Sequence, residues 1–307
     1  MNIRKDSGPL KWILIGISVL FLFVMLILPL SYVMYTAFSK GIKVFLAAVT
    51  DKYALHSIKL TIEVSLIAVV CNTFFGIFAS WLITKFQFKG KKIISTLIDL
   101  PLTVSPIIAG LIYVLTFGRQ SFIYPYLKAM GVRIIFAVPG IVLATIFVTF
   151  PFISRELIPV LTSQGTDEEE AAALMGANGW TIFWKVTFPH IKWPLLYGIV
   201  LCTARAMGEF GAVSVLSGHL RGRTNTMPLY IELLYQGYDF TGAFAVSAIL
   251  VLMAVIILVL RSVLEYKGQQ AAKAEKGSRK DRNALQQKGG TDYGRFTAGY
   301  REICRAS

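Results

Sequence analysis

Two opposite charges stand four residues apart inside an otherwise apolar run, Trp193–Leu220. If that run is helical, Arg205 and Glu209 lie on one face of the helix and can reach each other. Charged groups at bilayer depth are costly unless they are paired or face a cavity. The pair therefore predicts either a gate element, at a subunit interface or along a transport pathway, or a structural ion pair between two spans. Direct anion binding by Arg205 is the weaker interpretation, because Glu209 neutralises it.

Small and helix-breaking residues accompany this pair and a second apolar run, Ile93–Gly118. Gly208 and Gly211 flank Glu209, where they allow close helix contact in lipid or the flexibility of a gate. A broken span presents hydroxyls and free amides to an anion, although kinking without ligand contact explains the same residue types. The break in the second run is carried by Asp99, Pro101, Ser105 and Pro106.

A polar, basic and glycine-rich segment lies at the end of the run that holds the charged pair. It either receives a binding protein and steers an anion toward a pathway, or it is a solvated loop. Its residues are Ser217, Gly218, His219, Arg221, Arg223, Thr224 and Asn225.

The one long polar segment between apolar runs, residues 162–192, has strong local helix signals. Thr166 and Glu169 have the spacing of a capping box, and the acids 167–170 suit the first turn of a helix. Gly176 predicts the end of this short helix. A second short helix follows, which we expect Pro189 and Pro194 to end. Such a helix pair suits docking into a groove on another protein, and it equally suits an interfacial hairpin packed on the membrane.

Sequence signals of catalysis and of metal binding are absent. The chain has no G-x-x-x-x-G-K-[ST] phosphate loop and no H-E-x-x-H motif. Its three histidines are isolated, and its three cysteines form no pairing framework. We therefore expect no catalytic residue, no metal site and no cofactor in this chain.

The elements that position these residues are membrane spans. Hydrophobic residues make up 55% of the chain and charged residues 16%, which excludes a soluble enzyme and a secreted disulfide scaffold. A spanning helix needs about 20 mostly apolar residues, and six runs qualify. They are Trp12–Ser39, Val64–Thr84, Ile93–Gly118, Ile134–Ser154, Trp193–Leu220 and Phe240–Leu260. The expected fold is an all-α polytopic membrane protein with both termini on one side.

Basic residues set the expected orientation. The dense basic loop Lys85–Lys92 favours a cytoplasmic N-terminus, and the net charge of +14 reflects topology and attraction to membrane lipid. A nucleic-acid partner is disfavoured, because no basic motif is interleaved with aromatic residues. We expect a cytoplasmic N-terminus at 1–11, a transmembrane domain at 12–264 and a polar, disordered cytoplasmic tail at 265–307.

One stretch of the polar loop follows a known pattern. Glu170-Ala171-Ala172, then Gly176, then Val186-x-Phe188-Pro189 resembles the EAA loop of ABC importer permeases, with Val and Phe where the family has Ile and Leu. The stretches 85–118 and 204–232 resemble the CysW-type permeases of sulfate/thiosulfate importers. Molybdate and tungstate permeases share the A-R-A-x-G-E-F-G-A element, so the S-G-H-x-R-G-x-T-N-T stretch is what favours sulfate.

The resemblance implies a type I importer permease of the bacterial cytoplasmic (inner) membrane. Its partners would be a second, homologous permease, two cytoplasmic ATPase subunits that bind ATP and Mg, and a periplasmic sulfate/thiosulfate-binding protein. Glu170, Ala171, Ala172, Gly176 and Pro189 would couple the permease to the ATPases. The alternative for Glu170 is a favourable interaction with the helix dipole, which the preceding acids already supply.

Two other classes of function fit less well. A secondary transporter needs intramembrane acids and usually visible repeats. A membrane-embedded enzyme needs a nucleophile–base pair or metal ligands within the spans. Another oxyanion, molybdate or tungstate, remains the alternative substrate, and the choice between sulfate and thiosulfate is open.

Overall fold

A computed structural model of the protein describes residues 9–268 and residue 270, and all packing below lies within residues 9–259. The described residues contain helices and no strand. The last helix, Phe240–Gly268, extends past the predicted end of the apolar domain at residue 264. The rest of the predicted polar tail lies outside the described residues, apart from residue 270.

In the described part of the chain, four helices are long and apolar enough to cross a membrane. They are Lys11–Phe38, Lys52–Lys85, Val138–Gln164 and Phe240–Gly268. Two further candidates are bent pairs: Lys91–Thr103 meets Pro106–Phe117 at 108°, and Gly179–Met207 meets Gly211–Ser217 at 51°. The total is the predicted six if each bent pair counts as one span.

The first span is one helix with a wide turn inside it. It comprises α1 (Pro9–Leu22), the π turn η1 (Phe23–Ile27) and α2 (Leu28–Phe38). The N–H of Leu28 donates to the carbonyl of Phe23, five residues back, just before Pro29, which has no N–H to donate. Buried contacts are few along this span. Tyr32 meets Phe244 edge to face at 6.1 Å between ring centroids.

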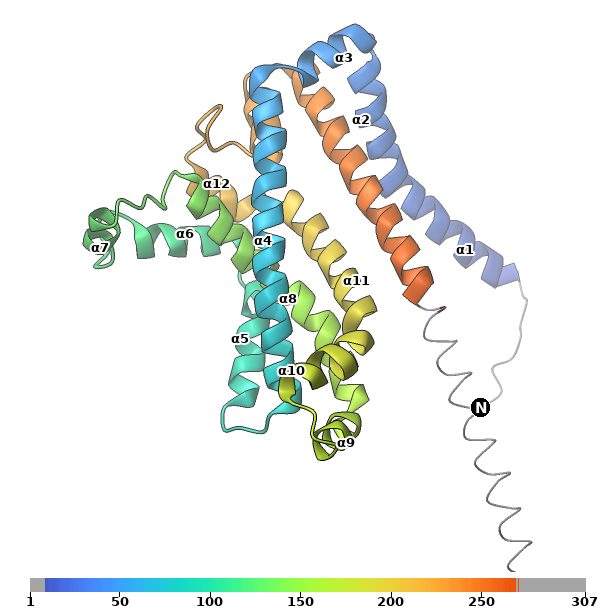
Figure 1. The fold of residues 1–307 in the computed structure, drawn as a ribbon. Helices are drawn as coiled ribbons and strands as arrows, with labels where there is room; N and C mark the ends of the chain where they lie inside the picture. The colour runs from blue at the N-terminus through green and yellow to red at the C-terminus, as the bar shows by residue number, and fades with distance from the viewer. Residues whose placement is uncertain (1–8, 269, 271–307) are drawn as a thin grey trace, which may run out of the picture. The chain divides into compact units, whose positions relative to one another are not determined.

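The core forms where α4 (Lys52–Lys85), α8 (Val138–Gln164) and α11 (Phe188–Met207) pack together (Figure 1). Ile153 of α8 is fully buried at its centre. A Cβ on Gly76 would lie 2.9 Å from the Ile153 side chain, and one on Gly198 would lie 3.2 Å from the Ile153 Cα. Both glycines therefore let α4 and α11 approach α8 closely, as small residues do between helices in lipid.

A buried amide crosses the same core. The Asn72 side chain of α4 donates to the Thr149 hydroxyl at 2.8 Å and to the Ile146 carbonyl at 3.2 Å, both on α8. Interhelical hydrogen bonds of this kind fix how two spans are rotated against each other.

The two bent pairs meet at their breaks. The chain turns at Val104-Ser105 between α5 (Lys91–Thr103) and α6 (Pro106–Phe117), because the residue before a proline avoids the α conformation. A Cβ on Gly110 of α6 would lie 2.7 Å from the backbone oxygen of Ala212 in α12 (Gly211–Ser217). The predicted break in the third span is confirmed at Ser105 and Pro106, whereas Asp99 and Pro101, which were predicted to contribute to it, lie within the helix α5. From this break α6 leads away from α5 across α12 (Figure 1).

Shorter helices complete the described chain: α3 (Ile42–Val49), α7 (Tyr124–Ala129), α9 (Asp167–Leu174), α10 (Gly179–Ile182), the π turn η2 (Phe183–Thr187) and α13 (Met227–Gln236). Asp51 begins α4 and accepts from the N–H of Tyr53 at 2.9 Å and from the Tyr230 hydroxyl of α13 at 3.2 Å. Burial raises the pKa of Asp51, but these hydrogen bonds and the charge of Arg221 outweigh it and lower that pKa below its usual value. Asp51 thus remains an ionised cap that ties α4 to α13.

Candidate functional site

The helix α9 does not begin with the predicted capping box. Thr166 is its N-cap residue, but the Thr166 side chain makes no capping hydrogen bond. Glu169 turns away from the helix start, and its Oε1 lies 3.0 Å from Lys85 Nζ and accepts from the Thr187 hydroxyl at 2.6 Å. A lysine ammonium binds a carboxylate more strongly than a backbone N–H does, which explains why the local pattern failed.

We call Lys85, Glu169, Thr187 and Gly165 the Lys85 cluster. Lys85 Nζ also donates to the Gly165 carbonyl. The side chains of Lys85 and Glu169 are 6% and 14% exposed, so this ion pair is largely shielded from solvent. The cluster joins the last residue of α4, the loop after α8, the helix α9 and the start of the fifth span. The sequence analysis missed it because the partners are far apart in the chain.

A second contact fastens the same helix. His190 Nε2 of α11 lies 3.0 Å from Glu168 Oε2. Both acids at the centre of α9's first turn are therefore directed at the second and fifth spans, and Glu170 is left on the outer face. Glu170 forms no ion pair with another described residue, and its side chain is exposed.

The predicted coupling residues share one loop but not one environment. Ala171 and Gly176 are exposed beside Glu170, Pro189 is exposed at the start of α11, and Ala172 is buried. Around them lie apolar side chains that no described residue covers: Leu174 is 90% exposed, Met175 82% and Trp180 71%. An apolar patch at the end of a loop is typical of a docking surface.

Gly176 ends α9 as predicted. Its φ of +83° is in the left-handed region, and a Cβ there would meet nothing within 4 Å, so backbone conformation and not space requires glycine. The N–H of Ala177 donates to Ala172 and that of Gly176 to Ala173, at 3.1 and 2.9 Å between N and O. This double closure is the Schellman motif.

The expectation that Pro189 and Pro194 end the second short helix is wrong. One helix runs from Gly179 to Met207, so the loop continues directly into the fifth span. The π turn η2 accommodates Pro189: the N–H of Phe188 donates to Phe183, five residues back, as Leu28 does to Phe23 in the first span. The part of the loop after Asn178 and the fifth span therefore form one continuous helix.

We expect the Lys85 cluster to hold α9 in place. Lys85→Met leaves the shielded Glu169 carboxylate without its cation, and breaking a buried pair from one side costs about 3–5 kcal/mol. Hydrogen exchange of residues 167–174 should accelerate strongly. Lys128→Met is the matched control, because Lys128 is exposed and pairs with no described carboxylate. The double variant Lys85→Met with Glu169→Met should recover much of the protection. Unchanged exchange in Lys85→Met would refute the role of the cluster.

The charged pair of the fifth span lies at a break and not within one helix. Arg205 Nη1 is 2.6 Å from Glu209 Oε2, which confirms the predicted ion pair. The helix ends at Met207, however, and α12 begins at Gly211. Glu209 sits between them, and its Oε1 accepts from the N–H of Ala212 at 2.8 Å. The carboxylate thus accepts from a backbone N–H in the first turn of α12 that has no partner within that helix. The i,i+4 spacing alone does not reveal this second role of Glu209.

The two sides of this pair differ in their access to solvent. The Glu209 side chain is 1% exposed, and that of Arg205 is 32% exposed. Gly208 was expected to allow close helix contact, but a Cβ there would meet only the Ala204 oxygen, at 3.8 Å. At Gly211 the expectation holds, because a Cβ would lie 3.0 Å from Pro106 of α6.

The other gate candidates divide between the two ends of α12. Ser105 is exposed in the break before Pro106, so it lies beside the contact between Pro106 and Gly211. Gly211 is two residues after Glu209 in the chain. Ser217 is fully buried at the far end of α12, where its hydroxyl accepts from the N–H of His219 at 3.2 Å. The structure therefore brings Ser105 close to the charged pair's break and places Ser217 away from it.

The segment after Ser217 is only partly a solvated loop. The Thr224 hydroxyl donates to the Ser217 carbonyl at 2.7 Å, and both Thr224 and Asn225 are buried. Arg221 is exposed but lies over the Tyr53 ring, 4.3 Å from its centroid. Among the described residues no group of three His, Cys, Asp or Glu side chains could hold a metal ion.

Comparison with known proteins shows which family the chain and its fold resemble. Residues 72–269 match the family described as "Binding-protein-dependent transport system inner membrane component". The sulfate transport system permease protein CysW of Escherichia coli is 49% identical over 267 residues, which cover 86% of this chain and 92% of that protein. CysW of Synechocystis sp. is 44% identical over 267 residues, or 87% and 96% of the two chains. A solved bacterial ABC transporter that imports the polysaccharide alginate has the same fold, with a TM-score of 0.69 at 19% identity, covering 85% of this chain and 96% of that one.

Proposed function

This chain belongs to the family of binding-protein-dependent transport system inner membrane components, and from that premise we propose that it is the permease subunit of an ATP-driven importer that brings sulfate or thiosulfate into the cytoplasm. The observation that supports sulfate or thiosulfate as the substrate is the similarity to two sulfate permeases across more than nine-tenths of their length. The chain is thus a transporter component of the inner membrane and supplies no catalytic residue of its own.

ATP and Mg are bound by two partner ATPase subunits, and the docking surface for them is the exposed face of the α9 loop. Glu170, Ala171 and Gly176 lie on that face beside Leu174 and Met175. Binding of ATP closes the two ATPases together and displaces the loop. Because Glu169 binds Lys85 and the loop helix runs into α11, the second and fifth spans move with it.

The charged break is the proposed gate. Spans three and five are bent where they meet, with Pro106 on one side and Gly211 on the other. Ser105 precedes the first, and Gly208 and Glu209 precede the second. A small rotation of α11 changes the Arg205–Glu209 contact, because Arg205 lies on α11 and Glu209 lies in the break that follows it. A second, homologous permease completes the pathway, and a periplasmic sulfate/thiosulfate-binding protein delivers the anion. Support for that partner is the solved alginate transporter in complex with its periplasmic protein.

Uptake of radiolabelled anions tests the substrate. The permease is expressed with its partner genes in cells that lack their own sulfate uptake, and import is measured for sulfate, thiosulfate, molybdate and tungstate. We expect sulfate or thiosulfate uptake that requires ATP hydrolysis. Uptake of molybdate or tungstate alone would replace the substrate assignment and leave the importer class intact. Uptake that depends on a proton gradient and not on ATP would refute the class.

Cysteine labelling tests the proposed orientation, in which both termini and the loop 162–192 are cytoplasmic. A cysteine at Lys89 should react with a membrane-impermeant maleimide only in inverted vesicles, and one at Arg223 only in intact cells. Both positions are exposed in the structure, whereas the neighbouring Asn225 is buried and would be a poor reporter. The reversed pattern would place the docking loop on the wrong side for an ATPase and would contradict the proposal.

A further inference from the structure

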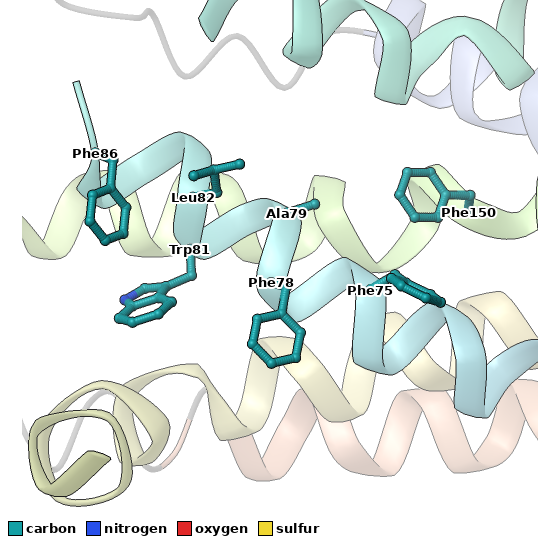
Figure 2. Close-up of a pocket in the computed structure, with 7 residues that line it drawn as sticks. All are labelled: Phe75, Phe78, Ala79, Trp81, Leu82, Phe86 and Phe150. Carbon is teal, nitrogen blue, oxygen red and sulfur yellow. The ribbon is translucent and has the colours of Figure 1, made fainter. Parts of the chain in front are cut away.

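An apolar groove of about 430 Å³ follows the second half of α4 (Figure 2). Phe75, Phe78 and Leu82 line it from α4, Phe150 from α8 closes one end, and Phe86 lies at the other. Its volume is within the roughly 300–1,000 Å³ of small-molecule pockets. From Phe75 to Phe86 the groove is about 16 Å long, at about 1.5 Å of helix rise per residue. The groove is thus elongated, almost purely apolar and parallel to a membrane span.

The groove ends at a basic loop. Phe86 is the first residue after α4, and Lys89, Lys91 and Lys92 follow it. No acid occurs between Lys85 and Ile98 in the sequence. None of these three lysines pairs with a carboxylate among the described residues, whereas Lys85 is held in its cluster. In the chain, the end of the groove at Phe86 is therefore followed within six residues by three ammonium groups that no described carboxylate neutralises.

We propose that this groove binds an anionic phospholipid, with one acyl chain along Phe75–Phe86 and the phosphate headgroup on Lys89, Lys91 and Lys92. Charge complementarity selects this occupant over a neutral lipid, since basic residues at the end of a span attract anionic headgroups. It also selects lipid over an apolar face of another protein, which would bury the three charges at a desolvation cost. The site is independent of which anion the protein transports.

The site touches the parts that join the loop to the spans. Trp81 lines the groove, and its ring meets that of Phe183 in η2 at 6.0 Å between centroids. Lys85, four residues further along α4, holds Glu169 of α9. A bound lipid therefore supports the same end of α4 that anchors the docking loop.

Native mass spectrometry of the assembled transporter tests the site, with phosphatidylglycerol and phosphatidylethanolamine of identical acyl chains as probes. The parent should retain phosphatidylglycerol preferentially. The triple variant Lys89→Gln, Lys91→Gln, Lys92→Gln should lose that preference by about tenfold or more, given the attraction of each lysine to an anionic surface. The matched control Lys43→Gln, Lys52→Gln, Lys128→Gln removes three exposed lysines elsewhere in the chain and should bind as the parent does. Ala79→Phe fills the groove and should reduce retention of both lipids.

Three results would overturn the proposal. The first is an unchanged phosphatidylglycerol preference in the Lys89 triple variant. The second is an equal loss of preference in the control triple variant, which would mean that lipid responds to net charge and not to this site. The third is efficient disulfide cross-linking between a cysteine at Phe78 and the second permease, which would make the groove a subunit interface. Monodisperse elution of each variant on size exclusion excludes misfolding as the cause of a loss.

Discussion

Replacing Arg205 with alanine should nearly abolish the yield of assembled transporter, and the loss should exceed that of Glu209→Gln. The Glu209 side chain is 1% exposed, so without Arg205 its charge remains buried with only the N–H of Ala212 as a partner. Breaking a buried pair in this way costs about 3–5 kcal/mol. Removing the Glu209 charge instead leaves Arg205, which is 32% exposed and retains access to water, so the penalty is smaller. Thermal unfolding of the purified complexes measures the difference.

A double variant then separates the two interpretations of the pair. Arg205→Met with Glu209→Met removes both charges together and should restore assembly relative to Arg205→Ala, since no isolated charge remains. If the pair is the gate, this variant assembles but leaks anion without ATP, and the leak is measured in proteoliposomes. If the pair only joins helices, transport returns to the parent rate. Strictly additive losses from the two single changes would contradict both interpretations.

Glu170→Lys should separate ATP hydrolysis from transport without unfolding the permease. Glu170 is exposed on the docking face and pairs with no described residue, so its replacement costs the isolated subunit little. At the proposed interface, the lysine of the variant would face ATPase side chains that normally contact a carboxylate. Loss of a central contact there costs about 2 kcal/mol or more, which is about thirtyfold in affinity. Transport should fall by at least that factor at limiting ATPase concentration, while the ATPase subunits continue to hydrolyse ATP.

Asp167→Lys is the control on the same helix. Asp167 lies in the first turn of α9, closer to its start than Glu170, so its reversal opposes the helix dipole more strongly. If Glu170 acted only through the dipole, Asp167→Lys would impair transport more than Glu170→Lys. Coupling through the docking face gives the opposite order. Parent-level transport in Glu170→Lys would show that this acid does not contact the ATPase.

The sequence predicted features that depend on neighbouring residues along the chain. Long uncharged runs gave the spans, and Gly176 gave the end of α9, because a left-handed residue after a helix is a local requirement. The break at Ser105 followed from Pro106 in the same way. Fixed spacing from Glu170 to Pro189 indicated the permease family, which the comparisons confirm.

What the sequence did not predict depends on a distant partner in one case, and in two others on where a helix ends or widens. The capping box failed because Lys85, more than eighty residues from Glu169 in the chain, competes for that carboxylate. Arg205 and Glu209 were assigned to one helix because i,i+4 spacing is the same whether or not the helix ends between them. Pro189 was expected to stop a helix because sequence rules treat an α-helix as the only helical state. Proline has no backbone N–H to donate, and the wider turn η2 lets the helix continue without that hydrogen bond.

The π turn at Phe183–Thr187 also sets the rotation of the docking face about the axis of the fifth span. An α-helix advances about 100° per residue, and a π turn accommodates about one extra residue in its wider loop. Trp180 and the docking face are therefore rotated by about that amount about the axis of the fifth span, compared with an uninterrupted helix of the same sequence. Deleting one residue of this turn would swing the face around the axis and leave every side chain on it unchanged. If this face binds the ATPase as proposed, recognition depends on the phase of the helix as well as on its residues.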